Sequence, residues 1–194
     1  MTNPLLAEWT GPHEMPPFAQ IRDDQFAQAV EAGLAEARAN IAAIAEDQAA
    51  PTFANTIEAL ELADAKLGRV LSVFYNLSGA DSTPAREALS RDFSPLLSAY
   101  SSEVSMNAAL FARIETLWEQ RDTLDLTDEQ QRLLFITRRG FVRQGAQLEG
   151  FARDRLASVK ARLAVLGTQF SQNLLADERG WSMRLDEADL GGLP

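Results

Sequence analysis

The segment DDQFAQAVEAGLAEARANIAAIAE, residues 23–46, decides the fold class of this 194-residue chain. Its larger apolar residues recur at intervals of three or four, which places them on one side of an α-helix. This stripe consists of Phe26, Val30, Leu34, Ala37, Ile41 and Ile44. The segment therefore predicts an amphipathic helix that buries one face against other helices.

Similar stripes predict four further helices downstream, over about residues 55–79, 84–121, 128–143 and 151–176. The last of them has an apolar side that we expect to be buried, formed by Leu156, Val159, Leu163, Leu166, Phe170 and Leu174.

Local signals mark where several of these helices begin. Asn55, followed by Glu58, resembles an N-cap with its capping-box partner. Thr83 precedes a proline at the first helical position, and Thr127 opens a second capping box. Pro95 predicts a jog within the helix over 84–121, because proline removes a helical hydrogen bond.

The two ends of the chain have other patterns. Residues 1–20 hold four of the eight prolines and no helical period, which predicts an extended arm. We expect this arm to lie on the body through Leu5, Leu6, Trp9 and Phe18. Near the other end, Trp181, Met183 and Leu185 alternate with polar residues, which predicts a strand. A single strand lacks a partner for its backbone groups, so we expect the rest of its sheet in further polypeptide.

Together these patterns predict an all-α fold, an antiparallel bundle of about five long helices with one C-terminal strand cut from its sheet. The expected parts are an extended arm over residues 1–20, a helical lobe over 21–178, and a connection over 179–194 that leads to a missing catalytic domain.

Composition excludes several classes of protein. The chain has no cysteine, which rules out disulfides, thiolate metal sites and cysteine nucleophiles and fits a reducing cytoplasm. No apolar run approaches the ~20 residues of a membrane helix, and no secretory signal is expected. The net charge of −10 argues against nucleic acid as a partner.

One part of the chain is basic, since residues 132–162 carry eight basic and two acidic side chains. This charge fits either a solvated helix face or a face that pairs with an acidic domain. Nucleic-acid binding is disfavoured because no aromatic stacking pattern accompanies the charge. The candidates for a basic face in a channel or between lobes are Arg132, Arg138, Arg139 and Arg143.

Catalytic motifs are absent from the sequence. His13 is the one histidine, and Glu14 follows it as in the HExxH zinc motif, but the position of the second histidine is occupied by Pro17. One histidine also cannot supply a His-His zinc site, and a serine triad would have to use this same residue. We therefore predict no catalytic and no metal-binding residue in this chain.

The order of several segments resembles a known family. The markers are PTFANTIEALE at 51–61, FVRQGAQL at 141–148 and FSQNLLAD at 170–177, followed by GLP at 192–194. This series is similar to the N-terminal region of the thimet oligopeptidase family of zinc metallopeptidases. Within the family it looks most like the bacterial peptidyl-dipeptidases (dipeptidyl carboxypeptidases), and next like oligopeptidase A.

The resemblance implies a cytoplasmic enzyme with two helical lobes around a channel that admits short peptides. In that family, zinc sits on an HExxH helix of the C-terminal half and activates water, with the glutamate as base. None of those positions occurs here, so the resemblance implies no zinc and no activity for this chain alone. The implied partners are its own C-terminal catalytic domain and short peptides that lose C-terminal dipeptides, not nucleic acid or membrane. The alternative is a free-standing helical module that binds proteins or peptides without catalysis.

Overall fold

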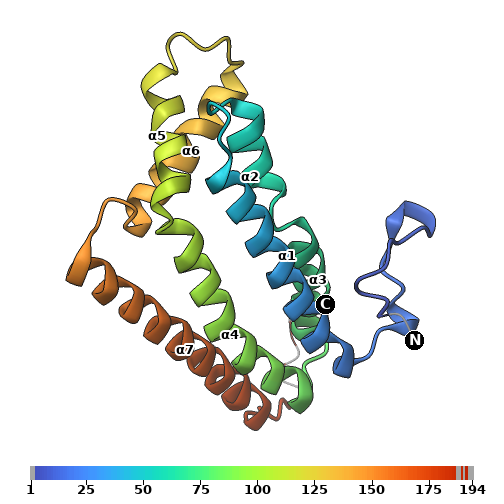
Figure 1. The fold of residues 1–194 in the computed structure, drawn as a ribbon. Helices are drawn as coiled ribbons and strands as arrows, with labels where there is room; N and C mark the ends of the chain where they lie inside the picture. Colours follow the sequence, from blue (N-terminus) through green and yellow to red (C-terminus); the bar gives the residue numbers. More distant parts are fainter. Residues whose placement is uncertain (1–2, 187–188, 190, 192–194) are drawn as a thin grey trace.

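The computed structural model describes residues 3–186, 189 and 191, and it confirms the all-α class (Figure 1). The helices are α1 Phe26–Glu46, α2 Ala59–Leu62, α3 Ala65–Ala80, α4 Pro84–Ser105, α5 Ala108–Gln120, α6 Asp128–Gln144 and α7 Gly150–Gly180. Short 3₁₀ turns precede α1, and a π-helical segment, η4 Phe53–Glu58, precedes α2. None of the described helices is both long enough and apolar enough to cross a membrane.

Two hydrophobic clusters hold the helices together, and α1 contributes to both. The first cluster joins the N-terminal half of α1 to α3 and α4, and Phe74 lies at its centre. The rings of Phe26 and Phe93 meet Phe74 edge-on, with centroids 5.2 and 5.0 Å away, a preferred aromatic geometry. The second cluster joins the C-terminal half of α1 to η4, α5 and α6. The predicted apolar stripe of α1 is buried along its whole length.

Two of the predicted helix starts are confirmed. The Thr83 side chain accepts a hydrogen bond from the backbone N–H of Arg86 at 3.3 Å, and Thr127 with Gln130 forms a capping box. The predicted cap at Asn55 is wrong. Thr52 is the N-cap of η4, and Asn55 is its partner in the capping box, three residues further on.

The single helix predicted over 84–121 is also wrong, because α4 ends at Ser105 and α5 begins at Ala108. Asn107 separates them, and its side chain accepts a hydrogen bond from the N–H of Leu110 at 3.0 Å. An asparagine side chain competes in this way with the helical backbone for hydrogen bonds. Pro95 lies inside α4 without ending it.

The N-terminal arm lies on the first cluster as predicted for three of its four apolar residues. Leu5 is fully buried, and Leu6 and Trp9 pack against the cluster. The indole N–H of Trp9 donates to the carbonyl of Pro4 at 2.9 Å, which folds the arm back on itself. Phe18 is 42% exposed, so the prediction that it anchors the arm is wrong.

Helix α7 departs most from the prediction. It runs antiparallel to α4, since Lys160 reaches Ser105 while Gln172 reaches Glu87 (Figure 1). None of its described side chains is buried, so the prediction of a buried stripe is wrong. The side of α7 that borders the space next to α4 carries mainly small or polar residues, such as Gly167 and Ser171, whereas Phe170 and Leu174 lie outside this lining and are exposed. The helices therefore form antiparallel pairs around two clusters, with α7 outside both.

The predicted strand is not formed over Trp181–Asp186, which have no regular secondary structure. The backbone at Trp181 is extended, but a strand needs a second segment to accept and donate its ladder hydrogen bonds. Helix α7 continues to Gly180. Residues 187–188, 190 and 192–194 of the expected connection lie outside the described residues.

Candidate functional site

The four arginines of the predicted basic face all lie on α6, where they make different contacts. Arg138 faces α5, where it pairs with Glu115 and its Nη2 donates to Oε2 of that carboxylate at 3.2 Å. Its guanidinium carbon also lies 5.1 Å from the ring centre of Trp118. A forked arginine–carboxylate contact fixes geometry as well as charge. Arg138 therefore serves the contact between α5 and α6.

Arg132 and Arg139 have a different contact. Their guanidinium carbons lie 5.3 and 5.1 Å from the ring of Phe135, one turn before it and one turn after it. Such cation–π contacts are modest in energy at an exposed site. Arg143 is exposed in the last turn of α6, where a positive charge complements the helix dipole. The structure thus places Arg132 and Arg139 at the ring of Phe135 and Arg138 at the ring of Trp118, whose centroid lies 6.0 Å from that of Phe135. A role in a channel or between lobes stays a prediction.

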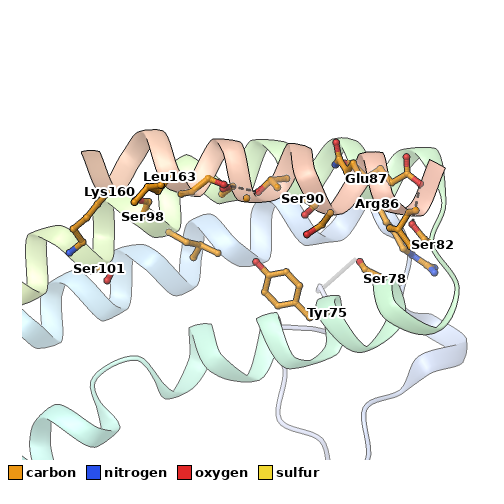
Figure 2. A pocket seen from close by; sticks show the side chains of 18 residues that line it. Tyr75, Ser78, Ser82, Arg86, Glu87, Ser90, Ser98, Ser101, Lys160 and Leu163 are labelled. Atoms are coloured by element: carbon orange, nitrogen blue, oxygen red, sulfur yellow. Dashed lines mark hydrogen bonds between the residues drawn. The ribbon is translucent and has the colours of Figure 1, made fainter. Parts of the chain in front are cut away.

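A second candidate, which sequence reasoning did not single out, is a groove of about 730 Å³ between α3, α4 and α7 (Figure 2). The ring of Tyr75 projects from α3 into it, and Lys160 and Leu163 line it from α7. The side contributed by α4 carries a row of hydroxyl groups, Ser90, Ser94, Ser98 and Ser101. We call this the α4 groove.

The serines face the groove because the opposite side of α4 is committed to the core. Phe93 and Tyr100 belong to the first hydrophobic cluster and point toward α1 and α3. The serines follow one another at intervals of four, four and three, which keeps them on a second side of the same helix.

Burial raises the pKa of Tyr100 to about 12, because the phenolate would lose water and lie near Asp64.

Polar links hold α7 on α4. Gln172 donates to the carbonyl of Glu87 at 3.0 Å and accepts from Arg91 at 3.0 Å. Arg179 pairs with the Glu87 carboxylate at 2.8 Å, and this hydrogen bond lowers the pKa of Glu87. Exposed pairs of this kind contribute little stability each. The α4–α7 contact is therefore more polar and less buried than the two hydrophobic clusters.

Lys160 lies at the end of the α4 groove that is nearest to Ser101, whereas Arg86 lines the opposite end (Figure 2). Its Nζ lies 3.4 Å from the hydroxyl of Ser105, a long hydrogen bond, and no carboxylate pairs with it among residues 3–186. Partial burial lowers its pKa, since the ammonium loses hydration without gaining a counter-charge. The groove thus holds an ammonium group that has no carboxylate counter-charge among the described residues.

The groove continues toward α6. A second cavity of about 570 Å³ is bounded by α2, α3, α4 and α6, and it shares Leu97 and Ser101 with the first. Its lining is largely apolar on α3 and α6, and Glu61 and Asp64 lie at its α2 side. One continuous depression therefore follows α4, with a basic group in its middle and acidic groups toward α2.

The groove has the chemistry of a binding surface. Its serines lack a histidine base, because His13 is exposed in the N-terminal arm. Within the part of the chain that the structure describes, no three His, Asp or Glu side chains gather where they could hold a metal ion. Serine hydroxyls, one lysine and aliphatic side chains can instead bind a polypeptide segment by packing and hydrogen bonding.

One signal for this groove is visible in the sequence. The spacing of Ser90, Ser94, Ser98 and Ser101 predicts a row of small polar residues on one side of α4. The apolar stripe of α7 is visible as well. What periodicity could not reveal is that these two sides would lie next to each other with space between them.

Comparison with known proteins gives relatives over the whole chain, although no family model matches it. Dipeptidyl carboxypeptidase of Salmonella typhimurium is 39% identical over 193 residues, which are 99% of this chain and 28% of that protein. Oligopeptidase A of Escherichia coli is 32% identical over 196 residues, which cover 100% of this chain and 28% of that protein. A thimet-like oligopeptidase of Dictyostelium discoideum is 28% identical over 146 residues. The chain spans less than a third of the length of these relatives.

Proposed function

This chain is a homologue of the dipeptidyl carboxypeptidases and oligopeptidases A, peptidases of the thimet oligopeptidase family, and on that premise we propose that it forms the N-terminal helical lobe of a longer zinc peptidase, here called the parent enzyme. The relatives confirm the predicted resemblance. The single observation that supports the proposal most is its extent, since 99% of the chain aligns at 39% identity with 28% of a peptidase.

The described residues do not fit a zinc site. His13 has a proline four positions later and is exposed, and no described cluster of carboxylates or histidines replaces it. We therefore assign zinc binding and peptide hydrolysis to polypeptide outside this chain. The lobe's own contribution is steric and electrostatic: it would form one wall of a channel, limit the size of the substrate and keep bulk water away from it.

The substrates are short peptides, and the reaction is release of C-terminal dipeptides. The choice of a dipeptidyl carboxypeptidase over an oligopeptidase rests on the higher identity, 39% against 32% over similar lengths. The parent enzyme would act in the cytoplasm, which agrees with a chain that has no cysteine.

The test uses the complete gene product that contains these residues, next to the 194-residue chain. We expect the complete product to release dipeptides from short peptides with free C-termini, as seen by mass spectrometry, and to hold about one zinc ion. We expect the 194-residue chain to show neither property. Peptide hydrolysis by this chain alone, or about one retained zinc per chain after dialysis, would contradict the proposal.

Charge reversal tests the basic face in the complete product. Arg138→Glu should lower the Tm, because it places two carboxylates together at Glu115. Arg139→Glu should leave the Tm nearly unchanged and weaken peptide binding, more so at low salt. Arg153→Glu, an exposed residue on α7, is the matched control. If peptide affinity and Tm respond equally little in all three variants, the arginines form a solvated face only.

A free-standing module that binds proteins or peptides is the second candidate, and the α4 groove is the observation that favours it. The two proposals predict different coding sequences after the codon for Pro194. A natural polypeptide that ends at Pro194 would support the module, whereas a frame that continues into an HExxH segment would support the parent enzyme.

A further inference from the structure

Helix α7 exposes the apolar side that its sequence pattern predicts to be buried. Phe170 is 69% exposed, Leu163 61% and Leu174 50%. These residues stand at helical spacing, so they form one continuous stripe along α7 rather than scattered contacts. Exposed Trp181 and Met183 extend the apolar surface beyond the end of the helix. A continuous apolar surface of this kind marks an interaction site.

The stripe borders the α4 groove, because Leu163 belongs to both (Figure 2). We propose that the α4 groove and the apolar stripe of α7 together receive an amphipathic helix from the polypeptide that follows residue 194 in the parent enzyme, and that this helix places a carboxylate against Lys160. The inference rests on the proposed function and specifies which surface of the lobe its partner covers.

The lining of the groove suits a helix. The α4 side carries Ser90, Ser94 and Ser98, and the α7 side carries Ala164 and Gly167. Small residues on two neighbouring helices let a third helix approach closely and insert its ridge of side chains between them. Tyr75 and Leu163 stand at the sides of this space and would pack against the apolar face of the incoming helix.

The charge of the groove specifies an acidic residue on that helix. Lys160 has a long contact to Ser105 and no ion pair among residues 3–186. A carboxylate at Lys160 would restore the counter-charge that the partly buried ammonium lacks.

The length of the relatives points to the same polypeptide as the source of this helix. The chain covers 28% of the dipeptidyl carboxypeptidase, so nearly three quarters of such an enzyme lies outside these residues. A segment tethered to the same chain also binds at a high effective concentration, which a second copy or a free peptide does not.

Site-specific photo-crosslinking in the complete gene product tests the occupant. A benzophenone amino acid replaces Leu163 in the groove, and the same group at Ala161, an exposed residue on the opposite side of α7, is the matched control. We expect position 163, and not position 161, to crosslink within one molecule to a segment beyond residue 194 that has helical apolar spacing and an acidic residue. Crosslinks to a second copy, to added substrate peptide, or to no protein at all would overturn the inference.

A charge variant provides an independent readout. Lys160→Glu should lower the Tm of the complete product but change the Tm of the 194-residue chain little, because the carboxylate partner is present only in the former. Arg155→Glu, exposed on the same helix, should have a small effect in both. An equal effect of Lys160→Glu in the two proteins would contradict the inference.

Peptidase activity separates the two proposals. An active zinc peptidase without the crosslink from position 163 would refute this inference and leave the proposed function intact. A complete product that forms the crosslink but neither hydrolyses peptides nor holds zinc would refute the proposed function and leave the docking surface standing.

Discussion

Replacing Arg113 by alanine should destabilise the chain more than any exposed substitution, because this residue holds the connection between α1 and η4. Its side chain is 8% exposed. Nη1 donates to the carbonyls of Asp47 and Ala49 at 2.7 and 3.0 Å. Nη2 donates to Asn55 Oδ1 at 3.1 Å and to the Asp47 carboxylate at 3.3 Å. One guanidinium thus satisfies four acceptors on a segment some sixty residues earlier in the chain.

The magnitude follows from what remains after truncation. Alanine leaves two carbonyls, an amide oxygen and a carboxylate without their charged donor and leaves a cavity where the guanidinium was. Breaking a buried, hydrogen-bonded charged network of this kind costs about 3–5 kcal/mol. In a chain of this size the loss corresponds to a fall in Tm of roughly 6–20 °C. Arg113→Lys keeps the charge but loses the fork, so we expect an intermediate loss.

Thermal and urea unfolding followed by circular dichroism measure these effects. Arg153→Ala is the matched control, because Arg153 is exposed on α7 and should change stability by no more than about 0.5 kcal/mol. If Arg113→Ala unfolds within about 0.5 kcal/mol of that control, the guanidinium does not hold the connection and the reasoning is refuted.

Three further substitutions test local features by the same unfolding measurements. Gly33→Ala should destabilise the chain, because the new Cβ would lie 3.0 Å from the Cα of Leu67 and push α1 away from α3. Gly68→Ala is the control: its Cβ meets nothing within 4 Å, so it should stabilise the chain by about 0.4–1 kcal/mol. Stability changes of the same sign in both variants would contradict the close approach of α1 to α3. Thr127→Ala should cost about 1 kcal/mol through loss of the α6 capping box, and an unchanged Tm would exclude a role for the cap. Burial raises the pKa of Tyr100 in the folded state to about 12, above the unfolded value of about 10, so its contribution to the free energy of unfolding is complete below about pH 10 and is lost as the pH rises toward 12. Between these pH values the free energy of unfolding should fall less steeply in Tyr100→Phe than in the unchanged chain. Parallel plots of this free energy against pH would refute the raised pKa.

Local signals predicted much of the helical architecture. The stripe of α1 is buried as expected, and Thr83 and Thr127 cap the helices that they precede. These features are readable because a cap or an apolar stripe depends on residues within a few positions of one another. The errors are also local. Thr52 is as good a cap as Asn55, and propensity alone does not choose between them. Asn107, the cap that separates α5 from α4, was overlooked inside a long helical pattern.

The candidate site was less predictable. The basic block on α6 was identified, but its division between Glu115 and Phe135 depends on how α5 packs against α6. The hydrogen bonds from Arg113 to the connection between α1 and η4 were not predicted. Two of their four acceptors are backbone carbonyls, which every residue has and no sequence motif identifies. The α4 groove was missed because it exists only between helices that are distant in the chain.

By itself, the sequence determined the helical class, the starts of α4 and α6 and the apolar side of each long helix, because these follow from the 3.6-residue period and from side chains that bond to nearby backbone groups. Only the tertiary structure decided which apolar sides are covered. Leu34 and Leu163 both belong to predicted apolar stripes, yet the first is buried and the second is 61% exposed. Burial requires an apolar surface from another part of the chain at that place, and α4 contributes mainly serines to the groove that Leu163 lines.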